Sequence, residues 1–113
     1  MRYPDIKNLL GLKSGECQTM EELRVEIDQL DQRIVDLIVL RQGYMDQAAR
    51  IKRDRNKVRD NDRVEDVVSK VSSYAKEHGA DPALVSELYR SMIEWSINYE
   101  MKKFDQLKQD EQG

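Results

Sequence analysis

Apolar residues recur every three or four positions from residue 23 to residue 48, which is the spacing of one face of a helix. The members of this seam are Leu23, Ile27, Leu30, Ile34, Leu37, Met45 and Ala48. A seam sustained over so many turns is typical of a coiled-coil-like spine rather than of an ordinary globular helix. Thr19 is followed three residues later by Glu22, the spacing of a capping box, so we expect the helix to begin near residue 19. Turn-forming residues between 53 and 62 predict where it ends.

Two shorter helices are predicted after this turn. Asn61 or Asp62 can cap the second helix, and Gly79 is expected to end it. Asp81 is expected to cap the third helix, with Pro82 at its first position. The apolar residues of the second helix are Val64, Val67, Val68, Val71 and Tyr74. Those of the third helix form two edges, which contain Leu84, Leu88, Met92, Trp95 and Tyr99 on one and Val85, Tyr89 and Phe104 on the other. Such wide coverage predicts burial against more than one neighbour.

The pattern therefore predicts an all-α chain with three helices, of which the first is very long. We expect an N-terminal extension at residues 1–18, a helical domain at 19–107 and a polar tail at 108–113. The first helix would be roughly 50 Å long, too long for the two shorter helices to cover its seam. A second copy of the long helix is the simplest cover, so we expect an intertwined helical homodimer.

Several polar residues lie where the pattern requires core residues. Arg41 and Lys52 occupy two further positions of the first seam, and their separation of eleven residues aligns them to within ~20° at a distance of about 16 Å. Arg24 is about 25 Å from Arg41 along the same helix, so it could join them only from an antiparallel partner chain. On the third helix, Ser96 and Glu100 interrupt the second edge one turn apart.

These residues could form one enclosed site. The second helix adds Asp60 and Arg63 near its capping turn. Burying unpaired cations costs several kcal/mol each, so a site of this kind should bind a small dianion. Each residue also has a simpler interpretation. An arginine in a core position, such as Arg41, can fix the helix register, and Arg24 can pair with acidic neighbours at the surface. Ser96 can be an ordinary small helix residue, and Glu100 can reach solvent.

Composition excludes several other classes of protein. The net charge of -3 argues against a dedicated nucleic-acid binder, and we interpret the cation-rich stretch 50–63 as a solvated helix end. Cys17 and His78 are the only residues of their types, so neither a disulfide nor a conventional zinc site is expected. We interpret Cys17 as a spectator thiol. The sequence contains no glycine-rich phosphate loop, and no cofactor is expected. No stretch approaches the ~20 apolar residues of a membrane span, and the expected location is cytoplasmic.

Three segments resemble a known enzyme family. They are "ELRVEIDQLDQRIVDLIVLRQGYMDQAARIK", "VRDNDRVEDVV" and "LYRSMIEWSINYE". Together they resemble the all-helical class of chorismate mutases and its relatives, the isochorismate-pyruvate lyases. The resemblance covers about residues 20–107 and rests on the joint spacing of its motifs rather than on any one of them.

The resemblance implies an intertwined homodimer with two sites, each completed by an arginine from the other chain. Arg41 and Arg24 of the partner subunit would bind the two substrate carboxylates. Lys52 would lie at the ether oxygen of the substrate, and Asp60 and Arg63 would flank the site. The implied reaction is the rearrangement of chorismate to prephenate in the shikimate pathway to aromatic amino acids. It needs no metal or other cofactor, because one C–O bond breaks while one C–C bond forms within a single molecule.

Ser96 would contact a substrate carboxylate, and two other positions depart from the family pattern. Glu100 occupies a position where many members have a glutamine that donates to the ether oxygen, and a carboxyl group can donate only when protonated. Mutase activity should therefore rise toward acidic pH. Val64 occupies a position where mutases often have a glutamate that contacts the ring hydroxyl. The expected function is chorismate mutase, and the alternatives are an isochorismate-pyruvate lyase or a non-catalytic helical dimerisation module.

Overall fold

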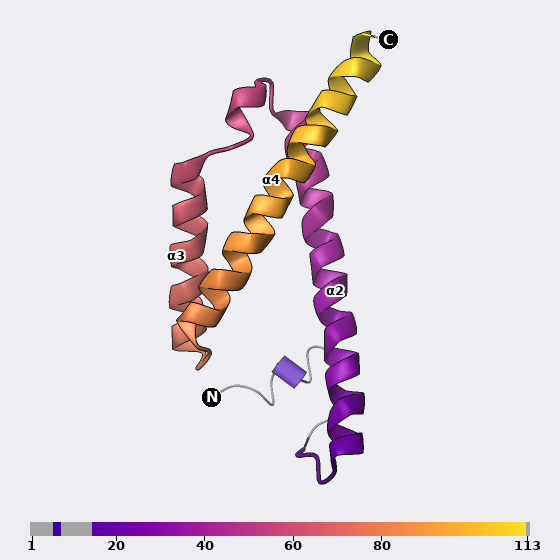
Figure 1. The fold of residues 1–113 in the computed structure, drawn as a ribbon, viewed down its shortest axis with the longest axis vertical. Helices are drawn as coiled ribbons and strands as arrows, with labels where there is room; N and C mark the ends of the chain where they lie inside the picture. Colours follow the sequence, from indigo (N-terminus) through magenta and orange to yellow (C-terminus); the bar gives the residue numbers. More distant parts are fainter. Residues whose placement is uncertain (1–5, 8–14, 113) are drawn as a thin grey trace. The chain divides into compact units, whose positions relative to one another are not determined.

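A computed structural model describes residues 6–7 and 15–112 of the chain (Figure 1). Its main elements are helix α2 (Met20–Ile51), the short 3₁₀ helix η1 (Arg55–Lys57), helix α3 (Asn61–Glu77) and helix α4 (Pro82–Gln112). No strand occurs among the described residues, so the all-α prediction with three helices is confirmed. Most of the predicted extension at residues 1–18 lies outside the described part of the chain.

The start of α2 agrees with the predicted capping box. The Thr19 hydroxyl oxygen accepts a hydrogen bond from the Glu22 amide at 3.1 Å, and the Glu22 carboxylate accepts one from the Gln18 amide at 3.0 Å. These bonds satisfy amide groups that have no partner inside the helix. At the other end, the Lys52 amide donates to the Ala48 carbonyl oxygen at 2.9 Å, so Lys52 directly follows the last turn.

The start of α3 differs by one residue from the prediction. Asp60, rather than Asn61 or Asp62, is the cap, and its side chain accepts a hydrogen bond from the Arg63 amide at 3.1 Å. Asp60 has the extended backbone that a cap requires, whereas Asn61 and Asp62 already belong to the helix. Gly79 ends this region with φ of +82°, in the left-handed region that favours glycine.

The start of α4 agrees with the prediction, but its end does not coincide with the predicted domain boundary. The Asp81 carboxylate accepts a hydrogen bond from the Ala83 amide at 2.9 Å, and Pro82 is the first helical residue. The helix then continues to Gln112. Residues 108–112, predicted as a polar tail, are therefore helical.

The chain divides into two compact units, residues 1–41 and 42–113. In the second unit α3 lies alongside α4 (Figure 1). Buried side chains from the turn before α3, from α3 and from α4 form the core of this unit, and they are Val58, Val68, Ile93 and Ile97. Val64, Val67, Tyr89 and Met101 pack against them. This small core fixes the backbone that carries the polar residues of α4.

Two predictions about burial need correction. Tyr74 is 64% exposed, while Ala75 is buried instead and Tyr74 stacks on His78 with ring centroids 4.0 Å apart. Ala75 lies two turns after Val68 and so shares its face, which leaves Tyr74 about 100° away from that face. On one edge of α4, Leu84 and Trp95 are exposed within the single chain, while Met92 and Tyr99 of the same edge are half-buried.

The seam of α2 is largely uncovered within the single chain. Leu23 and Leu30 are each 38% exposed, and Leu37 is 57% exposed. Isolated exposed apolar residues are common, but a continuous row along a helix is typical of an interaction surface.

Candidate active site

Lys52 and Glu100 come together in the second unit although they are 48 residues apart in sequence. The Lys52 ammonium nitrogen lies 2.7 Å from the Glu100 Oε2 atom. Glu100 is only 4% exposed, whereas the Lys52 side chain is 30% exposed. Lys52 also donates to the Val58 carbonyl oxygen at 3.4 Å. The structure thus brings together the two residues that the sequence pattern placed on different helices.

Ser96 lies one turn before Glu100 on α4 and is 7% exposed. Among the described residues, Ser96 and Glu100 are the buried polar side chains. Polar groups on the core face of a helix lower stability unless they are well bonded, so such positions are candidates for function. The two residues share the buried face of α4 with Ile93, Ile97 and Phe104. The interpretation that Glu100 reaches solvent is therefore wrong.

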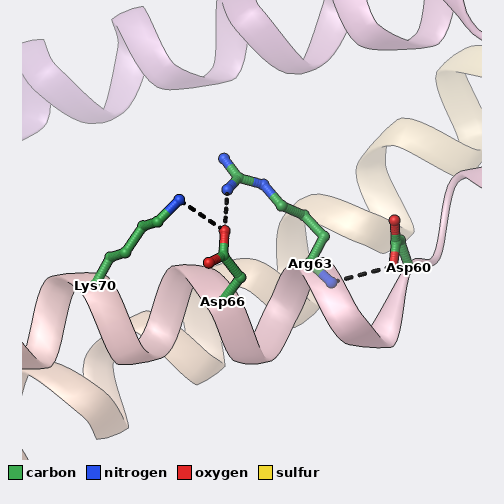
Figure 2. A network of polar contacts seen from close by, with 4 residues as sticks. All are labelled: Asp60, Arg63, Asp66 and Lys70. Atoms are coloured by element: carbon green, nitrogen blue, oxygen red, sulfur yellow. Dashed lines mark hydrogen bonds and ion pairs between the residues drawn. The ribbon is translucent and has the colours of Figure 1, made fainter.

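Asp60 and Arg63 belong to a separate polar network at the start of α3 (Figure 2). The Arg63 guanidinium contacts the Asp66 carboxylate at 2.8 Å, and the Lys70 ammonium contacts the same oxygen at 2.9 Å. The hydrogen bond from Lys70, supported by one from Arg63, holds the pKa of Asp66 below its usual value. All four residues are exposed, and the side chain of Arg63 extends along α3. The structure does not bring Asp60 or Arg63 into contact with Lys52.

Arg24 and Arg41 lie on α2 in the first unit. Arg24 is exposed and Arg41 is half-buried. Their predicted roles in binding carboxylates stay predictions.

Three polar contacts near Lys52 and Glu100 were not predicted from the sequence. Arg55 binds Asp105 on α4, with its Nε atom 2.9 Å from Oδ1, and Arg59 binds Glu94 on α4 through both carboxylate oxygens. The stretch 50–63 was interpreted as a solvated helix end, because its arginines have the sequence pattern of residues that face solvent. No local signal distinguishes an arginine that pairs with a residue 35 or 50 positions away from one that faces solvent.

The third unpredicted contact joins α2 to α4. The Tyr99 hydroxyl donates to the Asp46 carboxylate at 2.5 Å, and the Tyr99 ring stacks on Trp95 with centroids 5.5 Å apart. Tyr99 was predicted as an apolar position, and its ring does pack, but its hydroxyl supplies the polar contact. This bond attaches the end of α2, which Lys52 directly follows, to the helix that carries Glu100.

The site offers one ammonium, one buried carboxyl and one buried hydroxyl. Among residues 6–7 and 15–112, no group of three or more His, Cys, Asp and Glu side chains is arranged to hold a metal ion. In the same part of the chain, no helix has the length and apolar character to cross a membrane. The arrangement can place a positive point charge and a hydrogen-bonding carboxyl against one small region of a ligand.

Comparison with known proteins identifies the family of the chain. The model of the chorismate mutase type II family matches residues 23–101, so the chain belongs to this family and to the chorismate-utilising class of enzymes. The matched range includes every residue of the candidate site. The chain is also similar to an isochorismate pyruvate lyase of Pseudomonas aeruginosa, with 27% identity over 93 residues that cover 82% of this chain and 92% of the relative.

Proposed function

We propose that the protein is a chorismate mutase that converts chorismate to prephenate. The observation that carries the proposal is the 2.7 Å contact between the Lys52 ammonium and the buried carboxyl of Glu100. The family match supports the substrate class, since it covers both residues. We place this activity in aromatic amino acid biosynthesis in the cytoplasm.

The reaction explains why so few groups suffice. It is unimolecular, so an enzyme needs only to hold the dianion in its compact conformer and to stabilise the negative charge that grows on the ether oxygen. The Lys52 ammonium is a compact charge suited to that oxygen. Glu100 supplies a second hydrogen bond to the same oxygen when its carboxyl is protonated. No nucleophile and no net proton transfer are involved.

The ionised form of Glu100 opposes the reaction in two ways. Its negative charge repels the developing charge on the ether oxygen, and its contact with Lys52 competes for the ammonium. Protonation removes both effects, and the carboxyl then becomes a donor. The proposed mechanism therefore requires turnover to increase as the pH falls.

The remaining groups of the proposed site come from α2 and from a second copy of the chain. Arg41 and Arg24 of the partner subunit are proposed to bind the two substrate carboxylates, because planar guanidiniums bind carboxylates through two parallel hydrogen bonds. The exposed apolar row of α2, which includes Leu23, Leu30 and Leu37, supports the homodimer that this requires. Ser96 is proposed to contact one carboxylate. Asp60 and Arg63 are proposed to flank the site, which requires Arg63 to leave its contact with Asp66.

The test of this function is the loss of chorismate absorbance on incubation with the purified protein. Wild type should convert chorismate to prephenate, and Lys52→Ala should reduce kcat/KM by about 10²-fold to 10³-fold, as expected when one group that stabilises a developing oxyanion is removed. The matched control is Lys76→Ala, an exposed lysine in the last turn of α3. Equal activity of wild type and Lys52→Ala would refute the role of Lys52.

A second candidate function is an isochorismate-pyruvate lyase, which forms salicylate and pyruvate. Two observations favour it. A relative with that activity aligns along most of the chain, and Val64 stands where mutases often have a glutamate. Val64 packs against the core formed by Val58, Val68, Ile93 and Ile97, so this position offers no polar group to a ring hydroxyl. Incubation with isochorismate, followed by salicylate fluorescence, separates the two activities.

A further inference from the structure

The turn at residues 52–60 links α2 to α3 and is attached to α4 by two ion pairs. Arg55 contacts Asp105 with its Nε atom 2.9 Å from Oδ1 and its Nη2 atom 3.3 Å from Oδ2. Arg59 also binds Glu94 in a bidentate manner, through both carboxylate oxygens, with Nη1 3.0 Å from Oε2. Paired contacts of this kind fix the orientation of both groups as well as their distance.

The two attachment points lie on either side of Glu100 along α4. Glu94 and Asp105 are eleven residues apart, which corresponds to about 16 Å along the helix and ~20° around it. Glu100 lies between them in sequence, about 9 Å from the level of Glu94 and about 7 Å from that of Asp105. The turn is therefore held against the stretch of α4 that carries the buried carboxyl.

Val58 connects this turn to Lys52. It lies between Arg55 and Arg59, is 4% exposed and packs in the core of the second unit. Its carbonyl oxygen accepts a hydrogen bond from the Lys52 ammonium at 3.4 Å. A shift of the turn would move this acceptor and the backbone of Lys52 together, and with them the ammonium that contacts Glu100.

Exposed ion pairs contribute little to global stability, so the effect of these two should be local. The Arg59 and Glu94 side chains are 38% and 56% exposed. Arg90 and Glu65 form a comparable bidentate pair, with both contacts at 2.8 Å. This pair joins α3 to α4 and does not involve the turn. The chain thus contains a matched control for the two pairs of the turn.

We infer that Arg55 and Arg59 are positioning residues, whose pairs with Asp105 and Glu94 hold the 52–60 turn so that the Lys52 ammonium stays against Glu100. The consequence for turnover rests on the proposed function of the Lys52 and Glu100 pair. The effect on the turn itself does not rest on the proposed function, because it follows from the contacts alone.

The first experiment measures the turn without reference to activity. The Lys57 amide donates to the Asp54 carbonyl oxygen at 2.9 Å and the Val58 amide to that of Arg55 at 3.1 Å, so their hydrogen exchange reports opening of the turn. In Arg55→Ala and in Glu94→Ala, exchange at these two amides should be faster by about tenfold. Acylation of the Lys52 amine by a small reagent should also be faster. In Arg90→Ala, neither rate should change.

The second experiment measures kcat and KM with chorismate and with isochorismate. Arg59→Ala should lower kcat by about tenfold and change KM less, since a small displacement of a catalytic group costs rate more than binding. The double variant with Arg59→Glu and Glu94→Arg restores an ion pair with its charges exchanged, and it should recover turn protection and most of kcat. Arg90→Ala should keep wild-type kcat.

The outcomes separate the inference from the proposed function. Unchanged exchange and acylation in the turn variants would overturn the inference, whatever their activity. Faster exchange with wild-type kcat would overturn the positioning role. If the wild type converts neither substrate while the turn variants show faster exchange and faster Lys52 acylation, the proposed function fails. The inference that the two ion pairs position the turn and Lys52 is then retained.

Discussion

Replacing Glu100 by glutamine tests the proposed chemistry most directly. The side chains have nearly the same shape, so Glu100→Gln keeps the packing of α4 at a residue that is 4% exposed. The amide donates a hydrogen bond at every pH, whereas the carboxyl donates only when it is protonated. In wild type, kcat/KM should therefore fall with rising pH, and in the variant it should stay nearly constant.

The size of the difference follows from the geometry. Ionised Glu100 accepts from the Lys52 ammonium at 2.7 Å and offers no donor to the substrate, so one stabilising contact with the developing charge is lost. Loss of one such donor lowers turnover by about 10²-fold to 10³-fold, which corresponds to about 3–4 kcal/mol. At the alkaline end, Glu100→Gln should be about 10²-fold more active than wild type.

The assay is chorismate consumption between about pH 5 and pH 8, with kcat and KM determined separately at each pH. Glu87→Gln, at an exposed position of the same helix, is the control for the loss of one negative charge. Its profile should follow that of wild type. A flat profile in wild type, or a steep one in Glu100→Gln, would refute the role of Glu100 as a protonated donor.

Three further predictions concern Arg41, the proposed dimer and the α3–α4 ion pair. Arg41→Ala should lower kcat/KM at least about 10²-fold, while circular dichroism and light scattering show an unchanged helical dimer. If Arg41 only fixes the helix register, Arg41→Leu should instead stabilise the dimer, and no small dianion should bind. Ile34→Glu places a charge on the exposed row of α2, where Ile34 is 45% exposed, and should convert the dimer to monomer in light scattering; an unchanged mass would exclude this row as the interface. The hydrogen bond from Arg90 lowers the pKa of Glu65 below its usual value, so the pair stabilises the fold at neutral pH and less as the pH falls into the range where Glu65 takes up a proton. Because the pair is exposed, urea unfolding of wild type and Glu65→Gln should differ by only a small amount near neutral pH and converge in acid; a difference independent of pH would contradict this linkage.

The helix boundaries were predictable because each depends on a few neighbouring residues. Thr19 with Glu22, Asp81 with Pro82, and Gly79 all act within one turn of the chain, and the structure has them as predicted. The cap of α3 was placed one residue too late, since Asp60, Asn61 and Asp62 are all competent caps in sequence. Only the backbone conformation at Asp60 decides among them.

The central pair of the site was predictable for a different reason. Lys52 continues an apolar seam, and Glu100 continues an apolar edge, so each is conspicuous as a polar residue in a core position. Arg55 and Arg59 could not be found this way, because an exposed arginine breaks no pattern. Their partners are fixed by the path of the turn across α4, which depends on the burial of Val58.

The polar face of α4 is difficult to explain as a device for stability alone. A buried ion pair loses more hydration than a hydrophobic pair of similar volume, and the latter is often neutral or more stabilising. Glu100 and Ser96 nevertheless interrupt a face whose other members, Ile93, Ile97 and Phe104, form an ordinary apolar core. The Lys52 side chain remains 30% exposed, while the side chain of its partner Glu100 is only 6% exposed. A partly exposed cation beside a shielded carboxyl is the arrangement expected where a charge must meet a ligand, and it is not one that packing alone would favour.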